Sequence, residues 1–209
     1  MANPQSLAPS PISLILASSS PRRRELLTEA GYQFRVMAPD ADVECGVCSS
    51  SGPAGLVTEL AFRKAAAIVR QLVNSPTSET ASFAPTIVLA ADTVAECDGF
   101  ILGKPRDEGH ARAMLAQLNG REHRVLTGIC LWTLGEKEPR IRVDATRLRM
   151  DELTEAQLDE YLASGQWEGK AGAFGYQDRL GWVHVVEGSA SNVVGLPMEL
   201  LAQMLAEQR

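Results

Sequence analysis

A turn rich in serine and arginine contains the first residues that could do chemistry. Residues 18–24 read Ser-Ser-Ser-Pro-Arg-Arg-Arg, and Pro21 after Ser20 is typical of a helix start. Such a start presents unpaired backbone N–H groups and the positive end of the helix dipole, so it suits an anion. Arg22 and Arg23 oppose that dipole, a mismatch that an anionic ligand in the turn would resolve. The alternative is that both arginines only reach surface carboxylates.

Two acidic positions could hold a metal ion or move a proton. Asp92 follows the β-branched, apolar run 86–91, so we expect it at the end of a strand. A carboxylate there can bind a divalent cation or take a proton from water that attacks phosphorus. Glu44, after Asp40 and Asp42, could supply a second oxygen ligand. The alternatives are a capping role for Asp92 and simple solvation of an acidic loop.

Two lysines could offset phosphate charge. Lys64 lies between apolar residues in a segment of helical spacing, and Lys104 lies in a Gly-Lys-Pro sequence after an expected hairpin. Our hypothesis is that both converge on the phosphates of a ligand. The alternative for each is a solvated surface position, with the aliphatic stem packed on the protein.

Other well-known catalytic patterns are absent from the sequence. It contains no GxxxxGK[ST], GxGxxG or GxSxG motif, which disfavours P-loop ATPases, dinucleotide-binding dehydrogenases and α/β-hydrolases. The three histidines, His110, His123 and His184, fall in an expected helix and two expected strands. We interpret them as structural.

The overall composition limits the class of protein. A chain of 209 residues with 45% hydrophobic residues can bury a core, and 20 Lys+Arg against 26 Asp+Glu give a net charge of -6. This balance argues against a nucleic-acid polymer as partner. No apolar run approaches the ~18 residues of a membrane span. Residues 1–11 lack positive charge, so we expect no secretory signal and a cytoplasmic location.

The cysteines allow two interpretations. Cys45 and Cys48 have CxxC spacing, which is half of a typical zinc site, whereas Cys97 and Cys130 stand alone. A structural zinc needs four ligands, and no HxxxH pair is present to complete the set. The pattern therefore favours reduced thiols of an intracellular protein.

Hydrophobic periodicity predicts alternating strands and helices, hence an α/β or α+β fold with no internal repeat. Thr154 and Gln157 form an expected capping box, and Asp98-Gly99 is an expected hairpin turn. We expect a flexible arm at 1–11, one catalytic domain at 12–209 and an exposed loop at 74–85. The expected strands are 12–17, 86–91, 94–97, 100–102, 182–186 and two that lie near 124–134 and 140–149. The expected helices are 21–31, 54–73, 106–119, 154–163 and 197–209.

Seven motifs follow one another along the chain: LASSSPRRRELL at 16–27, LAFRKA at 60–65, ADTV at 91–94, GKP at 103–105, GKAGA at 169–173, GYQ at 175–177 and SNVVGLP at 191–197. Taken in this order, they resemble the Maf family of nucleoside triphosphate pyrophosphatases over almost the whole chain from Ile12. The resemblance implies a mixed α/β fold in two lobes around a deep cleft, shared with inosine triphosphate pyrophosphatases. It also implies a reaction that releases a nucleoside monophosphate and pyrophosphate, and a homodimer as one possible assembly.

The resemblance also assigns roles to individual residues. It implies that Asp92 is the general base or a metal ligand, with Mg2+ or Mn2+ as the expected cofactor. The implied specificity positions are Arg22, Thr93 and Gln177. Roles in binding phosphate or metal are implied for Ser18, Arg23, Glu44, Lys64 and Lys104, with Lys170 as an additional candidate, whereas Arg24 is expected to be a solvated helix residue.

Arg22-Arg23 and Gln177 match the branch of the family that acts on dTTP and UTP. A glutamine can donate and accept at once, which suits the imide edge of thymine or uracil. Phe174 and Tyr176 depart from the family's usual tyrosine and aliphatic residue, and both flank the expected base pocket. Removal of modified nucleotides is a further role expected of such an enzyme. The alternatives are a pyrophosphatase for 7-methyl-GTP or a modified purine triphosphate, and a nucleotide-sensing regulator of cell division.

Overall fold

The computed structural model describes residues 12–44, 51–74, 85–178 and 181–207. The expected arm at 1–11, the cysteine pair Cys45 and Cys48, and residues 75–84 of the expected loop lie outside the described residues.

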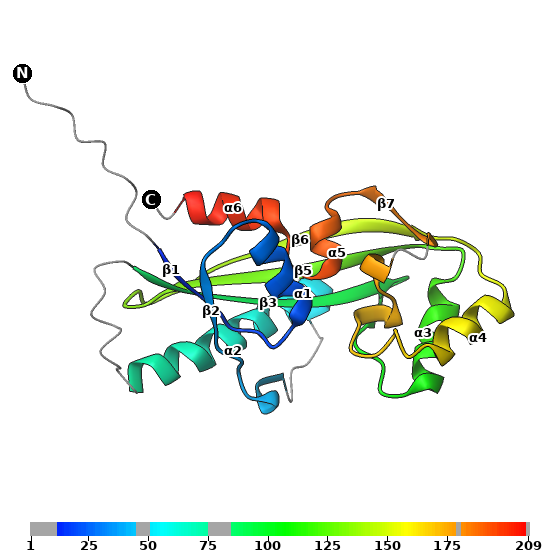
Figure 1. Ribbon diagram of the computed structural model, residues 1–209, viewed down its shortest axis with the longest axis horizontal. Coiled ribbons are helices and arrows are strands. Elements are labelled where there is room, and N and C mark those ends of the chain that lie inside the picture. Colours follow the sequence, from blue (N-terminus) through cyan, green and yellow to red (C-terminus); the bar gives the residue numbers. More distant parts are fainter. Residues whose placement is uncertain (1–11, 45–50, 75–84, 179–180, 208–209) are drawn as a thin grey trace, which may run out of the picture.

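A mixed sheet forms the centre of the protein (Figure 1). Its strand order is β2-β1-β3-β5-β6-β7, with β4 paired to β3. β1 runs parallel to β2 and β3, whereas the other pairs are antiparallel. The described strands are β1 (Ser13–Leu16), β2 (Phe34–Val36), β3 (Thr86–Cys97), β4 (Phe100–Leu102), β5 (Glu122–Thr133), β6 (Arg140–Met150) and β7 (Val183–Glu187).

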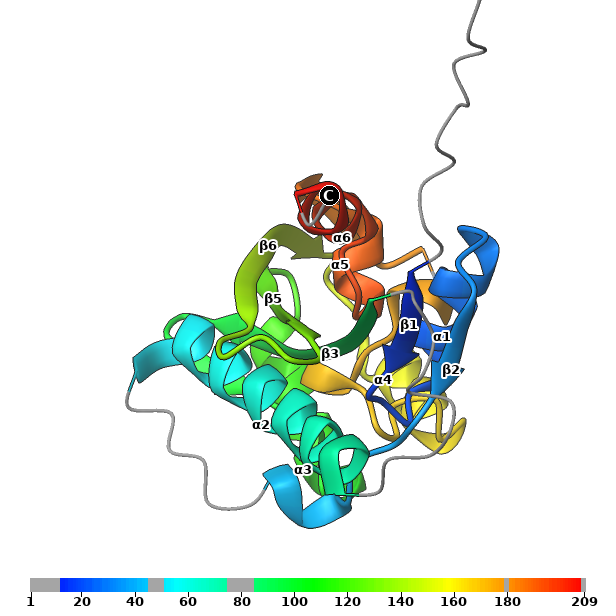
Figure 2. The same ribbon diagram turned by 90° about the vertical axis from the view of Figure 1, so that its left-hand side faces the viewer.

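Helices cover both faces of this sheet (Figure 2). α2 packs along β3 and β5 on one face, and α1 and α6 pack on the other. The described helices are α1 (Pro21–Glu29), α2 (Gly52–Asn74), α3 (Glu108–Leu118), α4 (Glu155–Ala163), α5 (Ala190–Val194) and α6 (Met198–Ala206), with short 3-10 turns η1 (Ala41–Glu44), η4 (Ala171–Ala173) and η5 (Tyr176–Asp178).

The alternation of side chains along β3 assigns each residue to one of these faces. Ile87 and Leu89 pack with α1 and α6, whereas Val88 and Ala90 pack with α2. Because successive side chains of a strand point to opposite faces, Asp92 is directed to the α2 side.

The long strands β3 and β5 join two separate apolar cores. Beyond Val94, β3 contributes Ala95 and Cys97 to a core built with α3, α4 and η4, at the opposite end from α2 and α6 (Figure 1). The structure therefore has the mixed α/β fold with two lobes that the sequence predicts.

Local sequence signals explain several turns. Asp98 and Gly99 have φ of 51° and 83°, as a two-residue hairpin turn requires, and they connect β3 to β4. Thr154 and Gln157 form the capping box of α4. The structure differs from the sequence-based expectation at β2, where no strand is expected, and at β3 and α5. β3 continues past Asp92, and the short helix α5 precedes α6.

Candidate active site

A gap in one edge of β3 is the structural basis of the site. β1 pairs with β3 as far as Leu89, and β4 pairs with it only from Ala95. Among the described strands, none pairs with the intervening residues on this edge, so side chains from both faces of the sheet reach one space. Asp92 and Thr93 lie in that interval. The expectation that Asp92 ends a strand is wrong, because apolar residues on both sides keep β3 continuous, but the gap gives Asp92 the access that a strand end would give.

Two adjoining cavities meet at this gap. The smaller has a volume of about 80 Å³, and six of the site residues expected from the sequence line it: Arg22, Arg23, Lys64, Asp92, Thr93 and Lys104. The larger has a volume of about 570 Å³ and is lined by Arg22, Gln177 and several aromatic side chains. Arg22 and Phe174 line both cavities and mark their junction.

The close approach of α2 to the sheet brings Lys64 to Asp92. Asp92 is paired across the sheet with Gly128, where a Cβ atom would lie only 2.5 Å from the Val57 carbonyl oxygen of α2. Glycine at this position therefore lets the helix backbone rest directly on β5. One result is that Lys64 Nζ lies 2.5 Å from Asp92 Oδ1, with 7% of the lysine side chain exposed.

Lys64 also binds the second expected acid. Its Nζ atom lies 2.7 Å from Glu44 Oε1, so one buried ammonium group holds two carboxylates. Lys104 Nζ lies 4.0 Å from Glu44 Oε2 and is largely exposed. Partial burial alone would raise the pKa of Glu44, but the hydrogen bond and charge of Lys64, with smaller contributions from Lys104 and Arg23, lower it overall. The two lysines and two acids therefore come together as the sequence predicts.

Arg23 connects three segments of the chain. Its Nε donates to the Gly195 carbonyl at 2.7 Å, Nη1 donates to Ser18 Oγ at 3.2 Å, and Nη2 donates to Thr93 Oγ1 at 3.1 Å. Burial lowers the pKa of this guanidinium, opposed by the charge of Asp92. Arg23 lines the smaller cavity, and its hydrogen bonds hold three segments of the cavity wall together.

A buried polar network continues from Thr93. Thr93 Oγ1 lies 2.9 Å from Thr127 Oγ1, and Thr127 donates to the Asn192 carbonyl at 3.1 Å. The Asn192 amide in turn donates to Thr146 Oγ1 at 2.9 Å. Since the Thr127 proton is used by Asn192, Thr93 is the donor to Thr127. Thr127 and Asn192 are supporting residues that sequence reasoning missed. The one feature of the sequence that could have indicated this role is Asn192, a polar residue inside the largely apolar SNVVGLP motif.

The helix start at α1 differs in detail from the expected anion turn. Ser20 has N-cap geometry, but its side chain makes no capping hydrogen bond, and its N–H donates to Ser18 Oγ at 3.2 Å. Arg22 Nη2 donates to the Gly169 carbonyl at 3.1 Å, which joins α1 to the other lobe. Arg24 is exposed and lines neither cavity, as expected.

The three histidines and the cysteines Cys97 and Cys130 line neither cavity, although His123 packs edge-on against Phe174, which lines both. Cys97 and Cys130 are buried free thiols, and burial raises the pKa of Cys130 to about 12. The described part of the chain has no cluster of three or more His, Cys, Asp or Glu that could hold a metal ion. Nor does it include a helix of the length and apolarity needed to cross a membrane.

Comparison with known proteins places this geometry in a family. The family model described as "Maf-like protein" matches residues 13–208, almost the whole described chain. The chain belongs to the Maf-like protein family. A relative from Rhodopirellula baltica, named dTTP/UTP pyrophosphatase, is 50% identical over 97% of this chain and 85% of its own length. Relatives of the same name from Symbiobacterium thermophilum and Pelotomaculum thermopropionicum are 42% and 39% identical, over 93% and 92% of this chain and 93% and 94% of their own lengths.

A solved structure shares the fold of this Maf-like chain. The Ham1 protein of Staphylococcus aureus superposes with a TM-score of 0.51 at 12% identity, covering 94% of this chain and 100% of that one. At this identity the likeness concerns the fold alone. It agrees with the mixed α/β architecture and with the two lobes described above.

Proposed function

We propose that this Maf-like protein hydrolyses dTTP and UTP to the nucleoside monophosphate and pyrophosphate. The observation that carries the proposal is the pair Asp92 and Lys64, buried in a small cavity whose other charged side chains are cations. Relatives up to 50% identical are named for this activity. A cavity with one carboxylate among several cations suits a substrate that is a polyanion and a reaction that needs a base.

The reaction step follows from the groups in the smaller cavity. Asp92 accepts a proton from water as the water oxygen forms a bond to the α-phosphorus. The bond from that phosphorus to the oxygen bridging the α- and β-phosphates breaks, and pyrophosphate leaves with this oxygen. Lys64, Lys104 and Arg23 offset the negative charge that builds up on the phosphates.

The two cavities divide the substrate between them. The smaller one, lined by cations, receives the triphosphate, and the larger one receives the nucleoside. Phe174, Tyr176 and Trp182 give the larger cavity aromatic walls against which a base can stack. Gln177 lies in the same wall, where its amide can donate to and accept from the imide edge of thymine or uracil. Arg22, at the junction, can contact both parts of the nucleotide.

Two carboxylates suit the expected Mg2+ or Mn2+ ion. Glu44 Oε1 and Asp92 Oδ1 lie 2.7 and 2.5 Å from one nitrogen atom, so they are no more than 5.2 Å apart. Mg2+ is commonly bound by one or two carboxylates together with substrate phosphates, so this pair fits such an ion. Glu44 and Asp92 would hold it. When bound, the ion would neutralise phosphate charge and polarise the phosphorus–oxygen bonds.

A panel of nucleoside triphosphates with Mg2+ and with Mn2+ tests the proposal. We expect release of monophosphate and pyrophosphate from dTTP and UTP, and its loss on chelation of the metal. No turnover of either nucleotide with either metal would refute it.

A purine triphosphate such as 7-methyl-GTP is the second candidate substrate, because a cavity of about 570 Å³ has room for a purine base. Faster turnover of that nucleotide than of UTP would favour it. Tight nucleotide binding without turnover would favour a nucleotide-sensing regulator instead. A homodimer and a cytoplasmic location remain part of the proposal, and sedimentation and cell fractionation test them.

A further inference from the structure

One short segment, residues 170–178, forms part of the wall of both cavities. Lys170 lines the smaller cavity, Gln177 lines the larger, and Phe174 lines both. The segment consists of the single turns η4 and η5 and contains no longer helix or strand. Its shape therefore depends on single backbone hydrogen bonds, such as that from the Gly172 N–H to the Gly103 carbonyl at 3.0 Å, and on side-chain contacts within and beneath it.

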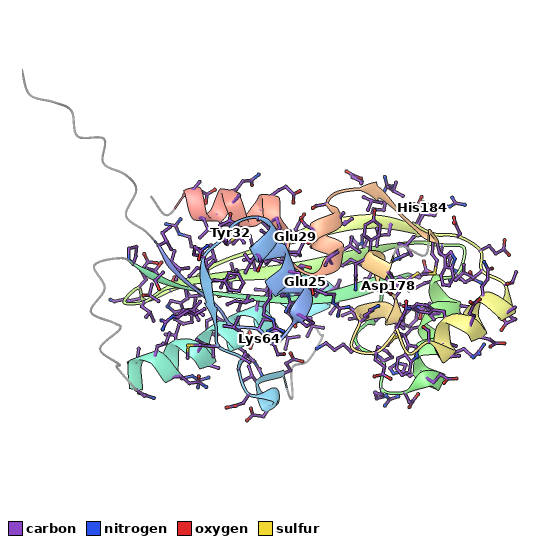
Figure 3. All side chains as sticks on the ribbon, viewed as in Figure 1. Glu25, Glu29, Tyr32, Lys64, Asp178 and His184 are labelled. Carbon is purple, nitrogen blue, oxygen red and sulfur yellow. The ribbon has the colours of Figure 1, made fainter. Side chains whose placement is uncertain are left out.

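A nearly buried ion pair lies inside this segment. Lys170 Nζ donates to Asp178 Oδ2, with 11% and 12% of the two side chains exposed. Tyr161 of α4 donates its hydroxyl to the same oxygen at 3.3 Å. Burial, together with the negative charge of Asp178, raises the pKa of Tyr161, so its hydroxyl stays a donor. In Figure 3, Asp178 lies between α1 and the lobe that contains α3 and α4.

The backbone of the segment is wrapped closely around this pair. A Cβ atom at Gly175 would collide with the Asp178 carboxylate and would lie 2.5 Å from Lys170 Nζ. The Asp178 N–H donates to the Gly175 carbonyl at 3.1 Å, which closes the turn that contains Gln177. Asp178 therefore lies directly beneath the turn, and a side chain at Gly175 would have to displace the ion pair.

The Gln177 side chain has no comparable support. It makes no hydrogen bond to any described residue, so its amide is available to a ligand. An amide can also rotate to present either oxygen or nitrogen, so the glutamine can favour one base only if its backbone is held in place. The adjacent Asp178 supplies that restraint.

We propose that Asp178, held by Lys170 and Tyr161, is a positioning residue that sets base selectivity by fixing the turn that carries Gln177. The inference rests on the proposed function, because it assumes that the larger cavity receives the base. In the same ion pair, Asp178 offsets the positive charge of Lys170, which lines the smaller cavity.

The test compares UTP with CTP, which differ in the hydrogen-bonding edge of the base. We expect Asp178→Asn to lower the ratio of kcat/KM for UTP over CTP by about tenfold, the loss typical of one misplaced hydrogen bond. Tyr161→Phe keeps the charges of Lys170 and Asp178 and removes only the hydroxyl, so it should lower the same ratio by a smaller factor. It also carries the test if Asp178→Asn does not fold.

Glu96→Gln is the matched control. Glu96 is likewise nearly buried, accepts from Arg124 Nε and the Gly99 N–H at 2.7 Å each, and lines neither cavity. Glu96→Gln should lower the melting temperature without changing the ratio of kcat/KM for UTP over CTP. Equal losses on UTP and CTP in Asp178→Asn, or an unchanged ratio in both variants, would overturn the inference while leaving the proposed function intact. Wild-type protein that hydrolyses neither UTP nor dTTP would instead refute the proposed function.

Discussion

The two cavities of this Maf-like protein are built in different ways. In the smaller one, Arg23, Lys64, Asp92 and Thr93 are all hydrogen-bonded to other residues of the chain, and most of these bonds join distant segments. In the larger one, the walls include the aromatic side chains of Tyr161, Phe174, Tyr176 and Trp182, and Gln177 has no partner among the described residues. The residues proposed for catalysis are thus held by the sheet and its helices, whereas the proposed recognition of the base depends on the short segment 170–178. Substitutions in the first region should lower all activity, and substitutions in the second should change selectivity.

Asp92→Asn should have the largest effect. An amide cannot accept the proton from water, so we expect kcat to fall by about 10²- to 10⁴-fold, the usual contribution of a general base. The side chain keeps its shape, and the circular dichroism spectrum should be unchanged. Activity within tenfold of wild type on both dTTP and UTP would remove Asp92 from its assigned role.

Arg23→Lys should come next, because it breaks the connection between three segments. A lysine cannot reproduce the bonds to Ser18, Thr93 and Gly195 together. We expect a loss of about 2–3 kcal/mol in the free energy of unfolding and a fall in activity on every nucleotide. Urea titration and steady-state kinetics would measure both. Arg24→Lys, on the exposed side of the same helix, is the control and should change neither; a stable, active Arg23→Lys would contradict this account of the smaller cavity.

Arg22→Lys tests a residue that belongs to both regions, because Arg22 lines both cavities. The lysine keeps the charge but loses the planar fork of donors, so the preference among nucleotides should change by about tenfold while activity on the best substrate falls less. The nucleotide panel measures this. If every nucleotide is affected equally, Arg22 acts only through its charge.

The smallest effect concerns His123, which packs edge-on against Phe174 with ring centroids 5.2 Å apart. Burial lowers its pKa from 6.5 to about 4, and neither ring nitrogen has a partner of normal hydrogen-bond geometry among the described residues. His123 therefore binds a proton more readily in the unfolded chain than in the folded protein. The stability that the neutral ring provides is present above pH 6.5 and is lost as the pH falls towards 4.

We expect the free energy of unfolding to fall by about 1 kcal/mol from this group between roughly pH 7.5 and 5.5. His123→Leu, which cannot be protonated, should lack that part of the decline. Urea titrations of both proteins at each pH would show it. Parallel declines would mean that His123 does not titrate as its burial implies.

Much of the site could be predicted from the sequence because its residues occur in short motifs. The turn before α1, the lysine of α2 and the Asp-Thr pair of β3 are local patterns, and the structure brings them to one cavity. The supporting residues were not predictable in this way. Thr127 and Asn192 are 65 positions apart, and each looks like an ordinary polar residue in its own segment. The same holds for Asp178, whose partner Tyr161 lies on α4.

The fold shows a similar division. The period-2 and helical patterns predict most elements, but they could not show that β3 passes through the site without ending at Asp92. The continuity of β3 and the access to Asp92 depend on which strands pair with its edge. The unpaired interval between β1 and β4 exists only in the folded sheet. The position of Gly128 beneath α2 is likewise understandable only from the packing of helix on strand.

The most direct test of the central claim is hydrolysis of UTP by the wild-type protein in water labelled with heavy oxygen. We expect UMP and pyrophosphate as products, with the label in UMP, because water attacks the α-phosphorus beside Asp92. Release of inorganic phosphate, or label in pyrophosphate with none in UMP, would contradict it.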